Sequence, residues 1–223
     1  MSRPLSDEHT DFSLYETMLW TPADGWKLLE EHLRRMLASA ACFGIPVERE
    51  AILSHASSLE RGFNSPRRVR FLLSREGRLS SECTPFVAPK EGSPLRARLE
   101  ASPVSVSERL LYHKTTYRPW YDEAKENLDG YDETLFYNAA GELTEFIAGN
   151  LLVELRGECL TPPVQCGLLP GTLRAHLLAE GLARERVLKA EDLADCGKVF
   201  FINSVRGRRE VSLDLQPSPA RSS

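Results

Sequence analysis

The sequence has no excess of positive charge, no paired-cysteine motif and no long apolar run. Its 28 lysines and arginines are balanced by 32 aspartates and glutamates, a formal net charge of −4, so it has no basic field to hold nucleic acid. The five cysteines are odd in number and lack CxxC spacing, which argues against a disulfide framework and a zinc site. No window approaches the roughly 18 apolar residues of a membrane span, and the first residues lack an apolar signal segment. These absences predict a cytoplasmic protein that binds neither membrane nor nucleic acid.

The pattern that is present suits an α/β protein of one or two domains, since 42% of the 223 residues are hydrophobic. Apolar spacing predicts helices over 27–43, 48–59 and 120–127, and one that begins at Gly171. Strands are predicted over 12–20, 67–74, 79–87, 95–111, 133–138, 151–156, 199–205 and 210–213.

The domain boundary is placed near Pro103, after a stretch at 88–94 that is rich in proline, glycine and charge. This predicts a small N-terminal α/β domain over 1–102 and a C-terminal domain over 103–215. The tail over 216–223 has two prolines and three serines among its eight residues, which predicts disorder.

A candidate phosphate site lies in Cys166-Gly-Leu-Leu-Pro-Gly-Thr-Leu-Arg174. A helix that opens on a glycine turn presents free backbone N–H groups and the positive end of its dipole, which together bind phosphate. The hydroxyl of Thr172 adds a further donor. An ordinary helix cap, with Pro170 before the helix and Gly181 at its end, explains the same residues.

Two further residues carry candidate chemistry. Lys114 follows an apolar, strand-like run, and a lysine among apolar side chains becomes a better nucleophile toward an aldehyde. Glu145 lies where a strand gives way to a turn that Asn150 is placed to brace. Taken singly, the lysine also suits a strand end with its ammonium in water, and the glutamate suits a solvated strand edge.

In combination these segments resemble the class IV aminotransferases, which are pyridoxal-phosphate (PLP) enzymes of fold type IV. Glu145-Phe-Ile-Ala-Gly-Asn150 resembles the family's Glu-x-x-x-x-Asn signature, and Leu160-Thr-Pro-Pro163 with Gly167-Leu-Leu-Pro-Gly-Thr-Leu-Arg174 resembles its phosphate segment. Glu31-His-Leu-Arg-Arg-Met36 resembles its His-x-x-Arg helix, where an exposed helical arginine is the alternative. The resemblance covers about Phe12 to Val211. It implies two mixed α/β domains with the cofactor between them, commonly as a homodimer.

Carried over residue by residue, the resemblance implies a role for each matching side chain. Lys114 forms the Schiff base with PLP and acts as catalytic nucleophile and general acid/base. Glu145 keeps the pyridine nitrogen protonated, which makes the ring an electron sink. The cofactor phosphate is implied to bind the Arg35 guanidinium, the backbone N–H groups of Thr172 and Leu173, and the hydroxyl of Ser204.

Two segments narrow the resemblance to the aminodeoxychorismate lyase group, in particular to lyase-like modules fused to aminodeoxychorismate synthase. His113-Lys-Thr-Thr-Tyr-Arg118 is similar to that group's His-Lys-Thr-Thr-x-Arg run, although Tyr117 stands where Asp or Asn is more usual. Phe200-Phe-Ile-Asn-Ser-Val-Arg-Gly207 resembles its Asn-Ser-x-Arg-Gly segment.

This narrower resemblance implies a lyase that forms 4-aminobenzoate and pyruvate for folate-precursor synthesis, with an aminodeoxychorismate synthase as functional partner. Thr17, Arg118 and Arg206 are the predicted contacts to its dicarboxylate substrate, and each also suits a structural role.

Two other interpretations remain open from the sequence. A class IV aminotransferase, acting on an amino acid or amine with an oxo-acid acceptor, would use the same cofactor residues. A non-catalytic relative would keep the fold and work beside a synthase, but the intact set of Lys114, Glu145 and Arg35 argues against it.

Overall fold

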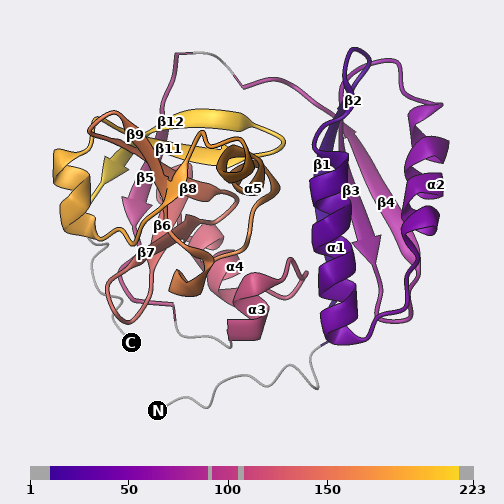
Figure 1. The fold of residues 1–223 in the computed structure, drawn as a ribbon, viewed down its shortest axis with the longest axis horizontal. Helices are drawn as coiled ribbons and strands as arrows, with labels where there is room; N and C mark the ends of the chain where they lie inside the picture. The colour runs from indigo at the N-terminus through magenta and orange to yellow at the C-terminus, as the bar shows by residue number, and fades with distance from the viewer. Residues whose placement is uncertain (1–10, 90–91, 105–107, 216–223) are drawn as a thin grey trace. The chain divides into compact units, whose positions relative to one another are not determined.

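The computed structural model describes residues 11–89, 92–104 and 108–215, which form two compact α/β units (Figure 1). The N-terminal unit contains residues 11–89 and 113–117, and the C-terminal unit contains the other described residues. Two mixed α/β units with separate sheets confirm the predicted fold class. The tail predicted to be disordered, 216–223, lies outside the described residues.

The N-terminal unit is a four-stranded antiparallel sheet in the order β2–β1–β3–β4, with two helices. Its elements are β1 (Leu14–Thr21), β2 (Gly25–Trp26), α1 (Leu29–Phe43), α2 (Arg49–Glu60), β3 (Arg67–Leu73) and β4 (Leu79–Pro85). One face of the sheet packs against the apolar stripes of the helices. Leu14 and Met18 of β1 share a core there with Leu33 and Met36 of α1 and Ile52 of α2.

Helix α1 ends at a glycine for a backbone reason. Gly44 takes a left-handed conformation with φ 65°, which only glycine adopts without strain. Its N–H and that of Ile45 bond the carbonyls of Ala41 and Ala40 at 3.3 and 2.9 Å, so the last turn of the helix is closed. The glycine therefore ends the helix where the sequence pattern predicts.

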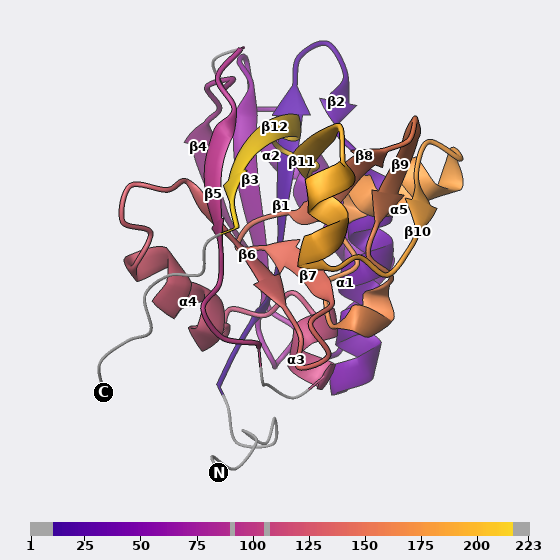
Figure 2. The same ribbon diagram turned by 90° about the vertical axis from the view of Figure 1, so that its left-hand side faces the viewer.

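The C-terminal unit is an eight-stranded sheet in the order β10–β9–β8–β11–β12–β5–β6–β7. Its strands are β5 (Leu95–Leu99), β6 (Glu133–Tyr137), β7 (Leu143–Phe146), β8 (Asn150–Leu155), β9 (Glu158–Thr161), β10 (Arg184–Glu185), β11 (Lys198–Asn203) and β12 (Gly207–Asp214). Strand β5 lies between β12 and β6 and runs parallel to both (Figure 2). Because β7 also pairs with β8, through Glu145 and Asn150, the six strands from β8 round to β7 close into a ring.

Short helices lie between these strands. They are α3 (Glu108–Tyr112), α4 (Pro119–Glu126), α5 (Thr172–Ala179) and the 3₁₀ turns η2 (Val164–Cys166) and η3 (Ala190–Asp195). The prediction of one strand-like run over 95–111 is wrong beyond Leu99, because Leu110 and Leu111 are buried by a helical turn. A short apolar run does not distinguish a strand from a helix. The other predicted elements are found, with ends that differ by at most three residues. No helix among the described residues is long and apolar enough to cross a membrane.

The chain changes unit earlier than the boundary placed near Pro103. Strand β5 pairs with β12 and β6 and so belongs to the ring of the C-terminal unit, which puts the transition between Pro89 and Gly92. Residues 113–117 then return to the N-terminal unit. Both features depend on pairing between distant segments, which a local pattern does not contain.

Gly77 provides a test of this packing. Its φ is +81°, and an added Cβ would overlap the carbonyl oxygen of Pro46, which is backbone and has little room to yield. We expect Gly77→Ala to lower the free energy of unfolding by more than about 2 kcal/mol, from backbone strain and overpacking together. Gly25→Ala is the matched control, because Gly25 has φ +68° and no atom within 4 Å of the added Cβ. Urea denaturation of both variants compares them, and equal losses would contradict the overlap.

Candidate active site

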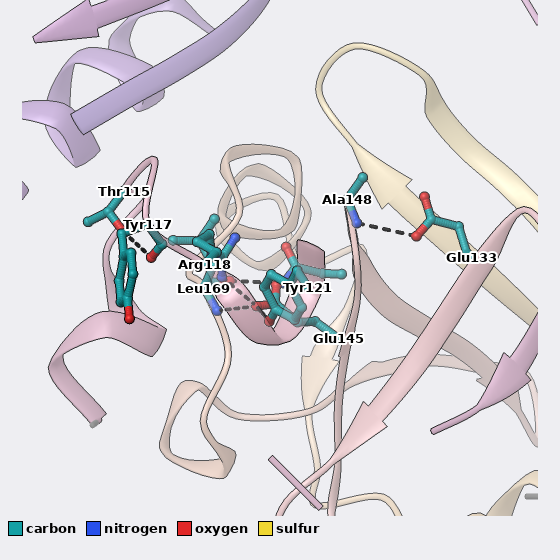
Figure 3. Close-up of polar contacts among 9 residues, drawn as sticks. Thr115, Tyr117, Arg118, Tyr121, Glu133, Glu145, Ala148 and Leu169 are labelled. Atoms are coloured by element: carbon teal, nitrogen blue, oxygen red, sulfur yellow. Dashed lines mark hydrogen bonds and ion pairs between the residues drawn. The ribbon is translucent and has the colours of Figure 1, made fainter. Parts of the chain in front are cut away.

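Lys114 lies in a segment that the N-terminal unit takes from the middle of the chain. Residues 113–117 run beside the start of β1, where Tyr15 N–H donates to the Lys114 carbonyl at 2.9 Å. The next residue, Thr115, is fully buried, and its hydroxyl donates to the carbonyl of Tyr117 at 3.0 Å (Figure 3). Backbone bonds thus fix the position from which the lysine side chain extends.

The face of the sheet opposite α1 brings a second cation close to this lysine. Lys114 Nζ lies 4.6 Å from the centre of the Tyr15 ring, and Arg70 Cζ lies 4.4 Å from the same centre. Both distances suit cation–π attraction. Arg70 is paired in register with Thr17, two residues after Tyr15, so these side chains project from one face. We call Tyr15, Thr17, Arg70 and Lys114 the Tyr15 face.

Arg70 was not among the predicted site residues. Its guanidinium NH1 lies 3.8 Å from Glu82, and its buried Nε has no hydrogen-bond partner. The sequence contained little indication of this role. The neighbours of an arginine in a strand, and the face of the sheet on which it lies, are unknown until the register of β1 and β3 is known. The structure places the predicted substrate residue Thr17 beside it.

On the opposite face of β1, Glu16 binds two side chains of α1. It is 2% exposed, and it accepts from His32 Nδ1 at 2.7 Å and from Arg35 Nε and NH2 at 2.7 and 2.5 Å. Burial alone would raise the pKa of Glu16, but the charge and hydrogen bonds of Arg35 and His32 lower it to about 2. Glu16 is therefore ionised at neutral pH. Burial lowers the pKa of His32 even though Glu16 opposes that shift, which favours a neutral imidazole.

Arg35, predicted to bind the cofactor phosphate, is held by this carboxylate. Two bonds from one guanidinium to one carboxylate fix its plane, which is the bidentate geometry that arginine favours. Its side chain is 10% exposed. The phosphate role of Arg35 stays a prediction, and Glu16 is the residue that orients it.

In the C-terminal unit, Glu145 lies at the centre of a buried polar cluster (Figure 3). It is 3% exposed, and its Oε1 accepts from the Tyr121 hydroxyl at 2.5 Å, from Leu169 N–H at 3.0 Å and from Arg118 NH2 at 3.3 Å. Its Oε2 accepts from Asn150 Nδ2 at 3.2 Å. Four donors thus satisfy a carboxylate that burial alone would strongly destabilise.

Tyr121 and Arg118 come from the start of α4 and act together on this carboxylate. Burial, and then the charge of Glu145, raise the pKa of Tyr121 well above its usual range, so its hydroxyl stays protonated and donates. Arg118 is 6% exposed, and its Cζ lies 4.1 Å from the centre of the Tyr121 ring. Arg118 was predicted as a substrate contact, but the structure gives it Glu145 and an aromatic ring as neighbours. Tyr121 was not predicted as a site residue, although it closely follows the His113–Arg118 run that resembles the lyase group.

Asn150 connects Glu145 to the segment before α5. Its Nδ2 also donates to the carbonyl of Leu169 at 2.9 Å, so both backbone groups of Leu169 are bound within the cluster. An added Cβ on Gly171 would overlap Asn150 Oδ1, so no larger residue fits at that position without a shift. Arg174 of α5 donates to the carbonyl of Pro162 at 2.7 Å. The start of α5 is therefore fixed by the signature residues themselves.

The remaining predicted residues lie at this helix start and at one turn. Thr172, the first residue of α5, is 3% exposed, and Leu173 packs against Leu152 and Phe200. Ser204 is 5% exposed, and Arg206 is at the end of the same turn, between β11 and β12. The structure thus gathers Lys114, Thr17 and Arg35 in the N-terminal unit and the other six predicted residues, Arg118, Glu145, Thr172, Leu173, Ser204 and Arg206, in the C-terminal unit.

Comparison with known proteins finds similarity over most of the chain. A family model described as amino-transferase class IV matches residues 13–213. A Schizosaccharomyces pombe protein named "Putative aminodeoxychorismate lyase" is 31% identical over 217 residues, which is 93% of this chain and 92% of that protein.

Solved structures match over the same span. A Mesorhizobium loti protein described as a "Putative amino-acid aminotransferase" is 33% identical with a TM-score of 0.86, covering 92% of this chain and all of its own. The 4-amino-4-deoxychorismate lyase of Pseudomonas aeruginosa has a TM-score of 0.78 at 21% identity and covers 99% of this chain and 92% of its own. This last match concerns the fold alone.

The Glu16 cluster predicts a loss of stability in acid. A pKa of about 2 in the folded protein, against 4.5 ordinarily, contributes about 3 kcal/mol that is present above pH 4.5 and is lost as the pH falls toward 2. We expect Glu16→Gln to lower the free energy of unfolding at pH 7 by about 3 kcal/mol, since it leaves Arg35 buried without its charge partner. It should also flatten the dependence on pH below 4.5.

Glu30→Gln is the matched control, since Glu30 forms an exposed ion pair with Arg49. Its expected effect is below about 1 kcal/mol. Urea denaturation at several pH values measures both variants. An equal, small loss in both would show that the Glu16 cluster does not hold the unit together.

Proposed function

The chain belongs to the amino-transferase class IV family, whose enzymes depend on PLP, and from this premise we propose that it is a 4-amino-4-deoxychorismate lyase. This reaction releases pyruvate from a dicarboxylate and leaves 4-aminobenzoate. The observation that carries the proposal is the Tyr15 face, where an arginine with a spare donor lies on the same ring as the candidate Schiff-base lysine. The similarity to the Schizosaccharomyces pombe protein over nearly the whole of both chains supports it.

The donor groups present fit the cofactor. Lys114 supplies a primary amine for an aldehyde, and Glu145 supplies a carboxylate for a protonated pyridine nitrogen. At the start of α5 the backbone of Gly171 lies close against Asn150. The backbone N–H groups there and the hydroxyl of Ser204 are donors of the kind that bind phosphate. When bound, PLP withdraws electrons from the bond that breaks.

The residues of the chain then have separate tasks. Glu145 would keep the pyridine nitrogen protonated, and its four donors keep the carboxylate in one orientation. Lys114 Nζ would be the group that moves a proton on the substrate. Its backbone is fixed to β1, which limits the positions that the amine can take.

Arg70 is proposed to bind a substrate carboxylate. Its free Nε and the neighbouring Thr17 hydroxyl are the types of donor that a carboxylate accepts, and bidentate binding suits arginine. Glu82, at 3.8 Å, is too distant for a short ion pair, so an anionic substrate would compete with a weak partner.

A class IV aminotransferase is the second candidate. The observation in its favour is the 33% identity with the Mesorhizobium loti protein, which is described as an amino-acid aminotransferase. An aminotransferase uses the same lysine and carboxylate but requires an oxo-acid as second substrate. Product analysis separates the two activities.

The decisive experiment supplies enzymatically generated aminodeoxychorismate without any oxo-acid. We expect the wild type with PLP to be yellow, to be labelled on Lys114 by borohydride, and to release 4-aminobenzoate and pyruvate. Lys114→Ala should lose the label and about a thousandfold or more of the rate, because nucleophile and proton carrier are removed together. Lys125→Ala is the control, since Lys125 is exposed on α4. Turnover only when an amino donor and an oxo-acid are both present would replace the lyase with the aminotransferase.

Substitution of Arg70 tests the substrate site. Arg70→Gln should raise the KM for aminodeoxychorismate about tenfold, the effect of losing one hydrogen bond to a charged group, with a smaller change in kcat. Arg68→Gln removes an exposed arginine from the same face of β3 and should leave the KM within about twofold. Steady-state kinetics with the purified proteins measures both. Equal KM values for the two variants would remove Arg70 from the substrate site.

A further inference from the structure

Glu133 is a buried carboxylate to which none of the roles above applies. It begins β6 in the C-terminal unit, pairs in register with Ala97 of β5, and is 3% exposed. Its two oxygens reach two different turns. Oε2 accepts from Ala148 N–H at 3.3 Å (Figure 3), and Oε1 lies 3.6 Å from NH1 of Arg206.

The two turns carry the family signature and a candidate phosphate residue. The first, residues 147–149, joins β7 to β8 between Glu145 and Asn150. The second, residues 204–206, joins β11 to β12 and contains Ser204. Glu133 therefore contacts both turns from a third strand, β6.

The turns also contact each other directly. Asn203 Nδ2 donates to the carbonyl of Ala148 at 2.9 Å, while its Oδ1 accepts from Arg206 N–H at 2.7 Å. An added Cβ on Gly149 would lie 2.8 Å from the carbonyl oxygen of Ile202, so the first turn lies close against β11. Ala148 is thus bound through its N–H by Glu133 and through its carbonyl by Asn203.

The charge state of Glu133 changes near neutral pH. Burial raises its pKa to about 7, against the opposing effects of Arg206 and of the backbone N–H groups of Ala148 and Ile147, while the neighbouring Asp132 adds to the rise. Because the pKa is raised in the folded protein, ionisation of Glu133 weakens folding as the pH rises from 4.5 through 7. A buried acid that lowers stability at neutral pH is more common at functional sites than in purely structural cores.

We propose that Glu133 is a positioning residue that ties the turn carrying Ser204 to the turn between Glu145 and Asn150, and that the tie to Arg206 exists only while its carboxylate is ionised. The effect on PLP rests on the proposed function, because it requires Ser204 to contact the phosphate. While Glu133 is ionised and paired with Arg206, the turn is fixed and the Ser204 hydroxyl is held in place. With Glu133 protonated, Arg206 loses its anionic partner, while the hydrogen bonds of Asn203 remain.

The test compares the Kd of PLP for wild type and Glu133→Gln at about pH 6 and about pH 8.5, on either side of the Glu133 pKa. Gln keeps an acceptor for Ala148 N–H but has no charge for Arg206. We expect the variant to bind about threefold more weakly at the higher pH, the strength of a partly exposed ion pair, and equally at the lower pH. Titration of PLP or Lys114 affects both proteins alike and cancels in the ratio. Glu154→Gln, which breaks the exposed ion pair between Glu154 of β8 and Arg208 of β12, should leave the ratio at one.

A ratio that is the same at both pH values would indicate general structural damage and overturn the proposal. Arg206→Gln gives a second criterion, since the double variant should bind PLP no more weakly than Arg206→Gln alone. Additive losses would show that the two residues act separately.

The tie is also measured without cofactor. The backbone amide resonances of Ala148 and Arg206 should shift with a midpoint near pH 7 in the wild type and not in Glu133→Gln. If the protein bound no PLP, the proposed function would fail while this titration still decided the tie. Absence of the titration would overturn the tie even in a protein that binds PLP normally.

Discussion

Closure of the ring of strands in the C-terminal unit depends on one residue pair, Glu145 with Asn150. These two residues are the only register pair between β7 and β8, and their side chains also bind each other and the backbone of Leu169. Loss of this pair would remove the side-chain bonds to Leu169, which hold the segment that leads into α5. The same two residues therefore pair β7 with β8 and form part of the candidate site. This explains why the short Glu-x-x-x-x-Asn signature indicates both the fold and the site.

Three buried glutamates in this chain show how surroundings decide the chemistry of one residue type. Glu16 has an arginine and a histidine at hydrogen-bond distance, which keep its pKa near 2 despite complete burial. Glu133 accepts one backbone N–H at 3.3 Å and has a partly exposed arginine at 3.6 Å, and burial raises its pKa to about 7. Glu145 is bound by four donors, one of them cationic. All three side chains are nearly inaccessible to water, so burial does not distinguish them. The number and charge of the neighbouring groups account for the differences between the three carboxylates.

Local sequence pattern predicted most of the elements but none of the long-range pairings. The 3.6-residue spacing and Gly44 placed α1 within two residues of its observed start. The apolar run over 95–111 was misread in part, since burial of Leu110 and Leu111 is compatible with either a strand or a helix. Arg70 and Glu133 were missed because their importance lies in what faces them across the sheet. Family resemblance supplied Lys114 and Glu145, while burial and hydrogen bonds supplied the residues that hold them.

The discontinuity of the N-terminal unit has a consequence for biosynthesis. Ser13 N–H bonds the hydroxyl of Thr116, 103 residues further along the chain, and Leu14 bridges to Thr115. During translation the first sheet therefore emerges from the ribosome well before the strip that borders β1. Helices α1 and α2 form from local contacts, but the edge of β1 stays unpaired until residues 113–117 are synthesised, and unpaired edges favour aggregation. Slow translation between Pro89 and Tyr117 would lengthen that exposure, whereas a chaperone that covers strand edges would shorten its effect.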